Sequence, residues 1–156
     1  MPAAEPFEFL DPTFPPDADL HLVLTELHPG DSSPWKVPAY TFRMQNAQGE
    51  YMGRIRLRVG WSDGLIRYAG HVGYAVEKEF RGRHYAERAC RLIIPLARRH
   101  GMDEFWITCQ PDNLASRRTL ERLGAQCVGV IDVPPEYPLD AGVERQKMCF
   151  RLRLPQ

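Results

Sequence analysis

The sequence predicts a mixed α/β domain in which helices cover a sheet, and three observations lead to this prediction. Apolar and basic residues alternate from Tyr51 to Val59, as in a strand with one buried face. Apolar residues recur at helical spacing from Tyr85 to His100. The short apolar run Phe105–Cys109 is followed by a helix with a capping residue, Asn113 to Leu123. This succession of strands and helices is typical of a layered α/β fold.

The length and composition predict a single domain behind an N-terminal arm. The chain has 156 residues, of which 44% are hydrophobic, enough for one core. Five prolines precede Ala18, so residues 1–19 are expected to form an extended or irregular arm. Residues 20–156 would then form the domain.

For the first half of the domain, the sequence predicts three strands and little helix. Strand character begins at residues 20–27. The stretch 28–38 carries Gly, Asp, two Ser and three Pro, which is loop chemistry and too short for paired helices. Residues 40–45 and 51–59 flank the polar connection NAQGE and predict a β-hairpin.

The second hairpin strand carries a row of arginines. Ile55, Leu57 and Val59 would face the core, and the residues between them would point outward; these are Arg54, Arg56 and Arg58. This basic face has two interpretations, a solvated sheet surface or a surface that binds an anion or a substrate.

The remaining elements follow from local signals. Residues 67–76 are expected to form a strand whose glycines, Gly70 and Gly73, mark a bulge or a close approach by another backbone or a ligand. The run Phe105–Cys109 is expected to be a strand buried on both faces. Gly124 would end the second helix. Two final strands, at 126–133 and 146–154, would flank a Pro-rich loop.

Charge, cysteine content and the N-terminus exclude several classes of protein. Lys plus Arg and Asp plus Glu both total 20, which argues against binding to nucleic acid or an anionic membrane surface. The first residues have no basic or apolar region typical of a signal peptide, and no run of about 18 apolar residues occurs. The widely spaced cysteines predict reduced core thiols, no metal site and a cytoplasmic location; they are Cys90, Cys109, Cys127 and Cys149.

The strongest chemical signal is the basic turn VEKEFRGRHYAERAC, which runs from Val76 into the first long helix. A tight turn that enters a helix presents unpaired backbone N–H groups and the positive end of the helix dipole. Arg81, Arg83 and His84 would add charge or hydrogen bonds at its rim. The turn therefore predicts an anion site suited to a diphosphate.

This turn resembles motif A of the GNAT superfamily of N-acetyltransferases. Arg81 and Ala86 match that motif, and His84 stands where the family usually has Gly. The later segment PDNLASRRTLERLGA looks like motif B, with Asn113 opening the helix and Ser116 one turn later. GHVGYAV and IIPLARRHG are similar to a bacterial subgroup of uncharacterised predicted acetyltransferases. The resemblance spans about residues 55–154 and implies a mostly antiparallel sheet of about six to seven strands flanked by helices, with the first helix pair shortened or absent.

The resemblance also implies acetyl-CoA as co-substrate and a set of residues that bind it. Val76 would offer its backbone to the pantetheine arm, Asn113 would contact pantetheine, and Ser116 would lie near the thioester sulfur. The pyrophosphate would be surrounded by the residues of the turn: Arg81, Gly82, Arg83, His84, Tyr85 and Ala86. Asn113 can also act as a helix cap, and the two roles are compatible.

The catalytic residues are predicted with alternatives. In many members of the superfamily, a Tyr seven residues after the motif B Asn acts as the general acid. In this chain Leu120 stands at that position. Ser116 is then the first choice to protonate the thiolate or relay a proton, with Tyr137 as the second. His71 is the first choice of base and Glu77 the alternative. A structural serine and a hydrogen-bonded, half-buried imidazole are the other interpretations of Ser116 and His71.

Two functions are consistent with these features. The first is acetyl transfer to a primary amine of a small molecule, peptide or protein. The second is an acetyl-CoA-binding sensor or scaffold of the same fold, favoured by Leu120 and His84. Without the usual helix pair, the acceptor pocket is expected to be more open, or built by the arm, by the 134–142 loop or by a second subunit of a homodimer. Residues that could line it are Trp35, Trp61, Glu136 and Tyr137.

Overall fold

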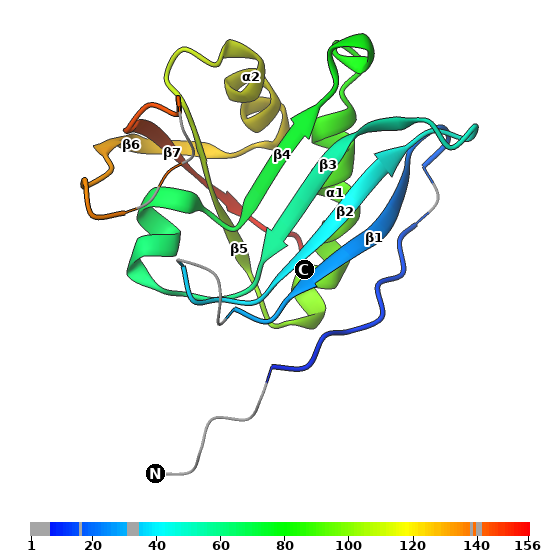
Figure 1. The fold of residues 1–156 in the computed structure, drawn as a ribbon, viewed down its shortest axis with the longest axis horizontal. Coiled ribbons are helices and arrows are strands. Elements are labelled where there is room, and N and C mark those ends of the chain that lie inside the picture. The colour runs from blue at the N-terminus through cyan, green and yellow to red at the C-terminus, as the bar shows by residue number, and fades with distance from the viewer. Residues whose placement is uncertain (1–6, 16, 31–34, 138, 140–141) are drawn as a thin grey trace.

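The computed structural model describes residues 7–15, 17–30, 35–137, 139 and 142–156 and confirms the predicted α/β architecture. None of the helices in these residues is long and apolar enough to cross a membrane. Figure 1 shows the elements in chain order: β1 (His21–His28), β2 (Ala39–Gln45), β3 (Tyr51–Arg58), η1 (Leu65–Ala69), β4 (Val72–Val76), η2 (Lys78–Phe80), α1 (Tyr85–Arg99), β5 (Glu104–Cys109), α2 (Leu114–Leu123), β6 (Gln126–Asp132) and β7 (Gln146–Arg153).

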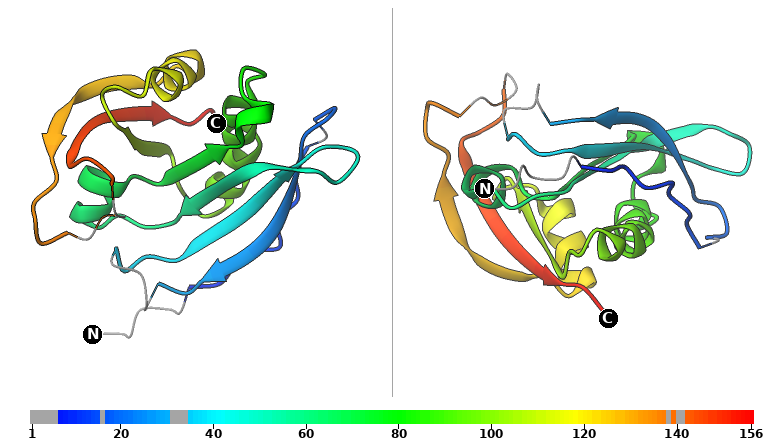
Figure 2. Two further views of the ribbon diagram at one scale, coloured as in Figure 1. Left: turned by 45° about the horizontal axis from the view of Figure 1, so that its top comes forward. Right: turned by 90° about the horizontal axis from the view of Figure 1, so that it is seen from below.

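The seven strands form two antiparallel sheets. One has the order β1-β2-β3-β4 and the other the order β5-β7-β6. An isolated bridge between Gly70 and Ile107 joins them. Both α-helices lie on the same side of the first sheet, where Ile55, Leu57 and the apolar face of α1 share one core (Figures 1 and 2). The mostly antiparallel fold is as predicted, but the strands form two sheets instead of one, and the break lies between β4 and β5.

The predicted strand at 67–76 is wrong in its first part. Residues 65–69 form the π-helical turn η1, which is closed by a hydrogen bond of 2.5 Å from the Gly70 N–H to the Leu65 carbonyl. The Ser62 hydroxyl starts this turn by accepting from the Leu65 N–H, and the buried Leu65 packs beside Trp35. A buried anchor and a polar cap thus outweigh the strand pattern. The expected close approach occurs at Gly70, where a Cβ would lie 2.7 Å from the Trp106 carbonyl oxygen.

The described part of the arm packs on the core. The rings of Phe7, Phe9 and Phe14 contact His100, Tyr40 and Phe42 respectively. Further along, Arg88 of α1 pairs with Asp17 and Asp19. The arm therefore lies on the same side of the first sheet as α1 (Figure 2). Between β1 and β2, the described residues 29–30 and 35–38 contain no helix, in agreement with a first helix pair that is shortened or absent.

Two predictions about burial need correction. Cys90, Cys109 and Cys149 are buried thiols, but Cys127 is exposed, because it lies beside a bulge in β6, an edge strand of its sheet. The strand β5 is not buried on both faces: Phe105, Ile107 and Cys109 are buried, whereas the alternate residues are half-buried. An antiparallel strand packs one face on the core and leaves the other more open.

Candidate functional site

The gap between β4 and β5 exposes main-chain groups of β4. The Arg58 N–H donates to the His71 carbonyl (2.7 Å) and the Glu77 N–H donates to the Met52 carbonyl (2.8 Å). In an antiparallel pair, every second residue points its N–H and C=O groups toward the same neighbouring strand. Gly73 and Ala75 therefore also direct theirs toward β3. Tyr74 and Val76 therefore direct their N–H and C=O groups away from β3. We call the opening between β4 and β5 the split.

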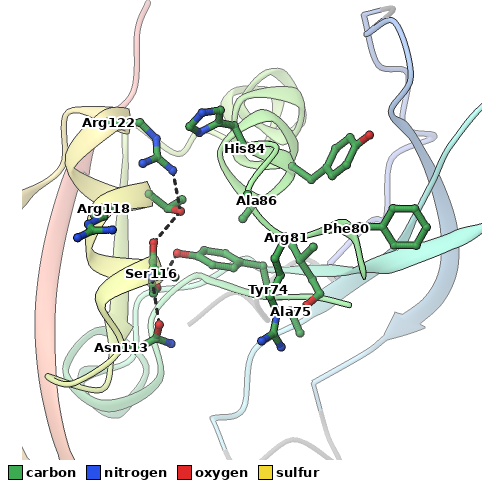
Figure 3. Close-up of a pocket in the computed structure, with 15 residues that line it drawn as sticks. Tyr74, Ala75, Phe80, Arg81, His84, Ala86, Asn113, Ser116, Arg118 and Arg122 are labelled. Atoms are coloured by element: carbon green, nitrogen blue, oxygen red, sulfur yellow. Dashed lines mark hydrogen bonds between the residues drawn. The ribbon is translucent and has the colours of Figure 1, made fainter. Parts of the chain in front are cut away.

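A cavity of about 480 Å³ lies beside the end of β4 that is farther from the Gly70–Ile107 bridge, between β4, the start of α1 and α2 (Figure 3). Its volume falls in the usual range for small-molecule sites. All but one of the predicted cofactor-binding residues line it: Val76, Arg81, Gly82, His84, Tyr85, Ala86, Asn113 and Ser116. Arg83 is exposed and does not belong to the lining. Residues predicted from two separate motifs thus meet in one cavity.

The outer end of the cavity is the turn Arg81 to Ala86, which we call the mouth. Two of its residues have left-handed backbone, Gly82 with φ 87° and His84 with φ 62°. His84 is the N-cap residue of α1, yet its side chain makes no capping hydrogen bond. The leading N–H groups of α1 are therefore available to a ligand at the mouth. The left-handed backbone explains why glycine suits position 84 and why His is tolerated at some energetic cost.

The charges around the cavity favour an anion. Three arginines, Arg81, Arg118 and Arg122, line it, and the described lining contains no Asp or Glu. Arg81 donates through Nε to the Val76 carbonyl (2.9 Å), which ties its side chain to the end of β4. Arg122 donates to Glu87 of α1 (2.7 Å) and so ties α2 to α1. A cationic rim around open N–H groups is a suitable site for phosphate groups.

Deeper in the cavity, Ser116 and Tyr74 form a hydroxyl pair. Their oxygens are 2.7 Å apart, and both residues line the cavity (Figure 3). Asn113 orients this region, because its Oδ1 accepts from the Ser116 N–H (3.1 Å) and caps α2. Burial raises the pKa of Tyr74 well above its usual value, so its hydroxyl stays protonated at neutral pH.

The sequence did not identify Tyr74 as a site residue. It lies 42 positions before Ser116, and nothing in the local pattern links the two. One signal was available: Tyr74 stands at the end of the strand that leads into the mouth, where an alternate residue must face either the core or the ligand. Tyr74 in fact contacts both the core and the cavity, because its hydroxyl meets Ser116 of α2.

His71 does not line the cavity, which removes the geometric basis for its predicted role as base. Its side chain is fully buried, its Nε2–H donates to the Gly60 carbonyl (2.9 Å), and its Nδ1 accepts from the Trp106 N–H (2.9 Å). Both ring nitrogens are thus engaged, and burial lowers the pKa of the ring. His71 instead holds together the closed end of the split, which we call the apex and which comprises Gly70, His71, Trp106 and Ile107.

Of the other predicted catalytic residues, Ser116 lines the cavity, whereas Glu77 and Tyr137 do not. Glu77 is exposed, one residue beyond Val76 at the end of β4. Tyr137 stacks on Trp35 at 5.6 Å and packs against Tyr68 at 4.6 Å. Trp61 contacts the edge of the His71 ring at 4.9 Å. Among the described residues, no three His, Cys, Asp or Glu side chains gather closely enough to hold a metal ion.

The family model of the acetyltransferase (GNAT) domain matches residues 11–126. The chain belongs to the GNAT acetyltransferase family. The match includes the described arm from residue 11, β4, the mouth and α2, so the cavity lies wholly within the GNAT domain. No curated protein matches the chain significantly.

Solved GNAT structures share the fold. The microcin C7 self-immunity acetyltransferase MccE, in complex with acetyl-CoA and AMP, is 20% identical with a TM-score of 0.58, over 74% of this chain and 61% of that one. RimJ of Mycobacterium smegmatis, in complex with CoA-disulfide, is 21% identical with a TM-score of 0.59, over 76% and 56%. The ribosomal-protein-S5-alanine acetyltransferase of Vibrio fischeri is 19% identical with a TM-score of 0.59, over 76% and 63%. The aligned region thus spans less than two thirds of each of these proteins.

Proposed function

We propose that this GNAT domain is an acetyl-CoA-dependent N-acetyltransferase that acts on a primary amine of a small molecule, peptide or protein. The observation that carries the proposal is the cavity itself. It connects open N–H groups at a helix N-terminus, suited to a diphosphate, with the Ser116–Tyr74 hydroxyl pair. Membership of the GNAT family supports the same reaction class.

The residues present fit acetyl-CoA. The mouth, with Gly82, His84 and the first turn of α1, would hold the pyrophosphate through main-chain N–H groups. The outward main-chain groups of Tyr74 and Val76 would pair with the pantetheine amides as a neighbouring strand does. Because the Val76 carbonyl already accepts from Arg81, its N–H is the group left for this contact. Acetyl-CoA would supply the acyl group as a thioester.

Ser116 and Tyr74 would manage the proton at the leaving thiolate. A lone hydroxyl is a weak acid, but Ser116 Oγ can donate its proton while it accepts one from the Tyr74 hydroxyl. Tyr74 of β4 would thereby take the part of the tyrosine that Leu120 of α2 replaces. Leu120 itself is fully buried in the core and has no access to the cavity.

Proton removal from the acceptor ammonium is assigned to Glu77. Glu77 is exposed and lies next to Val76 of the cavity lining but not in the lining itself, so it would act through a water molecule. His71 has no free lone pair for this task. Most of the rate gain in this scheme comes from positioning the amine beside the thioester.

Release of free thiol from acetyl-CoA tests the proposal. The purified chain is incubated with acetyl-CoA and a panel of amines, and thiol formation is followed with a chromogenic disulfide. We expect amine-dependent thiol release that falls about 10²-fold in Ser116→Ala, whereas Ser62→Ala, outside the cavity, keeps it. Acetyl-CoA binding without thiol release from any amine would instead support the sensor function, which the loss of the usual tyrosine at Leu120 favours.

A further inference from the structure

The reverse face of the first sheet carries an arginine row that the proposed reaction leaves unexplained. Ile55 and Leu57 face the core beside α1, so Arg54, Arg56 and Arg58 face the other way. On this face neither α1, α2 nor the described arm covers the sheet (Figures 1 and 2).

Carboxylates do not balance these guanidinium groups. Among the described residues, no Asp or Glu lies within ion-pairing distance of Arg54, Arg56 or Arg58. Glu26, on the neighbouring part of the face, is engaged with His28 at 2.8 Å. Arg54 even lies directly opposite another arginine, Arg43, and like charges across an antiparallel pair are unfavourable.

Arg58 is the most unusual member of the row. Its guanidinium is half-buried, and its Nη1 donates to the Gly70 carbonyl (3.1 Å) at the apex. Burial, together with the nearby charge of Arg56, lowers the pKa of Arg58 to about 10. A partly buried charge with no counter-charge is costly unless an anion accompanies it.

The position of Arg58 relates the row to the reaction site. Its Nη1 would lie 3.9 Å from a Cβ at Gly73, the residue of β4 next to Tyr74. Side chains alternate along a strand, so the Tyr74–Ser116 pair and Arg58 lie on opposite faces of the first sheet. Because Gly73 has no side chain, a ligand on the arginine face can approach the backbone of β4 closely.

We propose that the acceptor is an acidic peptide, bound on the face that Arg54, Arg56 and Arg58 form, with its amine directed to the split. This inference rests on the proposed acetyltransferase function. Arg54 and Arg58 are four residues apart, about 13 Å along an extended strand, so the row matches several carboxylates rather than one. Arg56 is held in place by its Nε, which donates to the Thr41 hydroxyl (3.1 Å), and it keeps its other donors for a ligand.

Direct binding tests the proposal without catalysis. The probe is a peptide with a free N-terminal serine, four acidic residues and a C-terminal fluorophore, and its partner has Asn and Gln in place of the Asp and Glu. Fluorescence anisotropy is recorded at about 0.05 M and 0.15 M salt. We expect the acidic probe to bind at least about tenfold more tightly than its amide partner, with the difference reduced by salt.

Three substitutions along the row should weaken binding of the acidic probe to different degrees. Arg58→Gln should weaken binding of the acidic probe at least about tenfold, and Arg56→Gln about threefold to tenfold. Arg54→Gln, at the exposed end, should weaken it less than about threefold. Arg153→Gln, an exposed arginine at the end of β7, is the matched control and should change nothing. Because Arg58→Gln also loses the bond to Gly70, its thermal unfolding is compared with that of the wild type, and Arg56→Gln provides the independent test.

The outcomes separate this inference from the proposed function. Equal binding of the acidic and amide probes, or wild-type binding by both Arg56→Gln and Arg58→Gln, would overturn the acidic acceptor even if neutral amines are acetylated. Tighter binding of a DNA duplex than of the acidic probe would also overturn it. If binding depends on Arg56 and Arg58 but no amine releases thiol from acetyl-CoA, the acidic binding face stands and the acetyltransferase proposal fails.

Discussion

The two ends of the split differ in how completely their polar groups are used. At the apex, the main chain and both ring nitrogens of His71 are hydrogen-bonded, and Gly70 packs directly on the backbone of β5. At the mouth, the first N–H groups of α1 have no side-chain cap, and a Cβ at Gly82 would meet no other atom within 4 Å. The closed end holds the two sheets together, whereas the helix N–H groups at the open end can bind a ligand.

The largest effect is expected at the apex, from Gly70→Val. A Cβ there would meet the Trp106 carbonyl at 2.7 Å, and φ is +78°, so the backbone cannot accommodate the side chain without moving. We expect a loss of about 3 kcal/mol in the free energy of unfolding, measured by urea denaturation. Gly101→Ala, with φ +80° but open space around it, should lose only about 1 kcal/mol. Equal losses would show that the apex is not specially packed.

Between the two ends, the hydroxyl pair should affect the rate and not the fold. Beyond the loss in Ser116→Ala, we expect Tyr74→Phe to lower kcat about tenfold, because Ser116 then has no proton source. KM for acetyl-CoA should change little, since the mouth is untouched. The experiment measures steady-state thiol release. Wild-type kcat in Tyr74→Phe would contradict the relay and leave Ser116 acting alone.

His71→Ala should behave as an apex variant. We expect a loss of about 2 kcal/mol in the free energy of unfolding, because the Gly60 carbonyl and the Trp106 N–H lose their buried partner. The folded variant should keep kcat within about threefold. A drop in kcat of about 10²-fold without loss of stability would restore His71 as the base.

The pH dependence of stability tests whether His71 is a structural residue of the apex, in contrast to a catalytic base. Burial lowers the pKa of His71 in the folded state, so the unfolded chain binds the proton more readily. The stabilisation by neutral His71 is present above the unfolded value of about 6.5 and is lost as pH falls through the folded value. We therefore expect the difference in Tm between wild type and His71→Ala to narrow from pH 7.5 to pH 5. His100, whose pKa is also lowered by burial, remains in both proteins and cancels in this comparison.

The mouth could be predicted from the sequence, whereas the apex could not. The turn 81–86 and the cap Asn113 are local signals, in which a few consecutive residues fix both conformation and chemistry. The roles of His71 and Tyr74 depend on partners 35 and 42 positions away. The same limit explains η1, which needs the contact of Leu65 with Trp35, and the exposure of Cys127, which follows from a bulge at a sheet edge.

The smallest effect is expected at the mouth, from His84→Gly. His84 has φ 62°, a conformation that costs a residue with a Cβ but not glycine. We expect a gain of up to about 1 kcal/mol in the free energy of unfolding and acetyl-CoA affinity within about threefold of wild type. If affinity falls about tenfold or more, the imidazole itself contributes to ligand binding.

Calorimetric titration with acetyl-CoA tests the central claim that the mouth binds its pyrophosphate. Ala86→Asp adds a carboxylate to the first turn of α1, where it suits the helix but repels a phosphate. Ala47→Asp adds the same charge at an exposed position of the β2–β3 turn. We predict one-to-one binding by the wild type and Ala47→Asp, and at least about tenfold weaker binding by Ala86→Asp. No binding by the wild type, or equal affinity in Ala86→Asp, would contradict the claim.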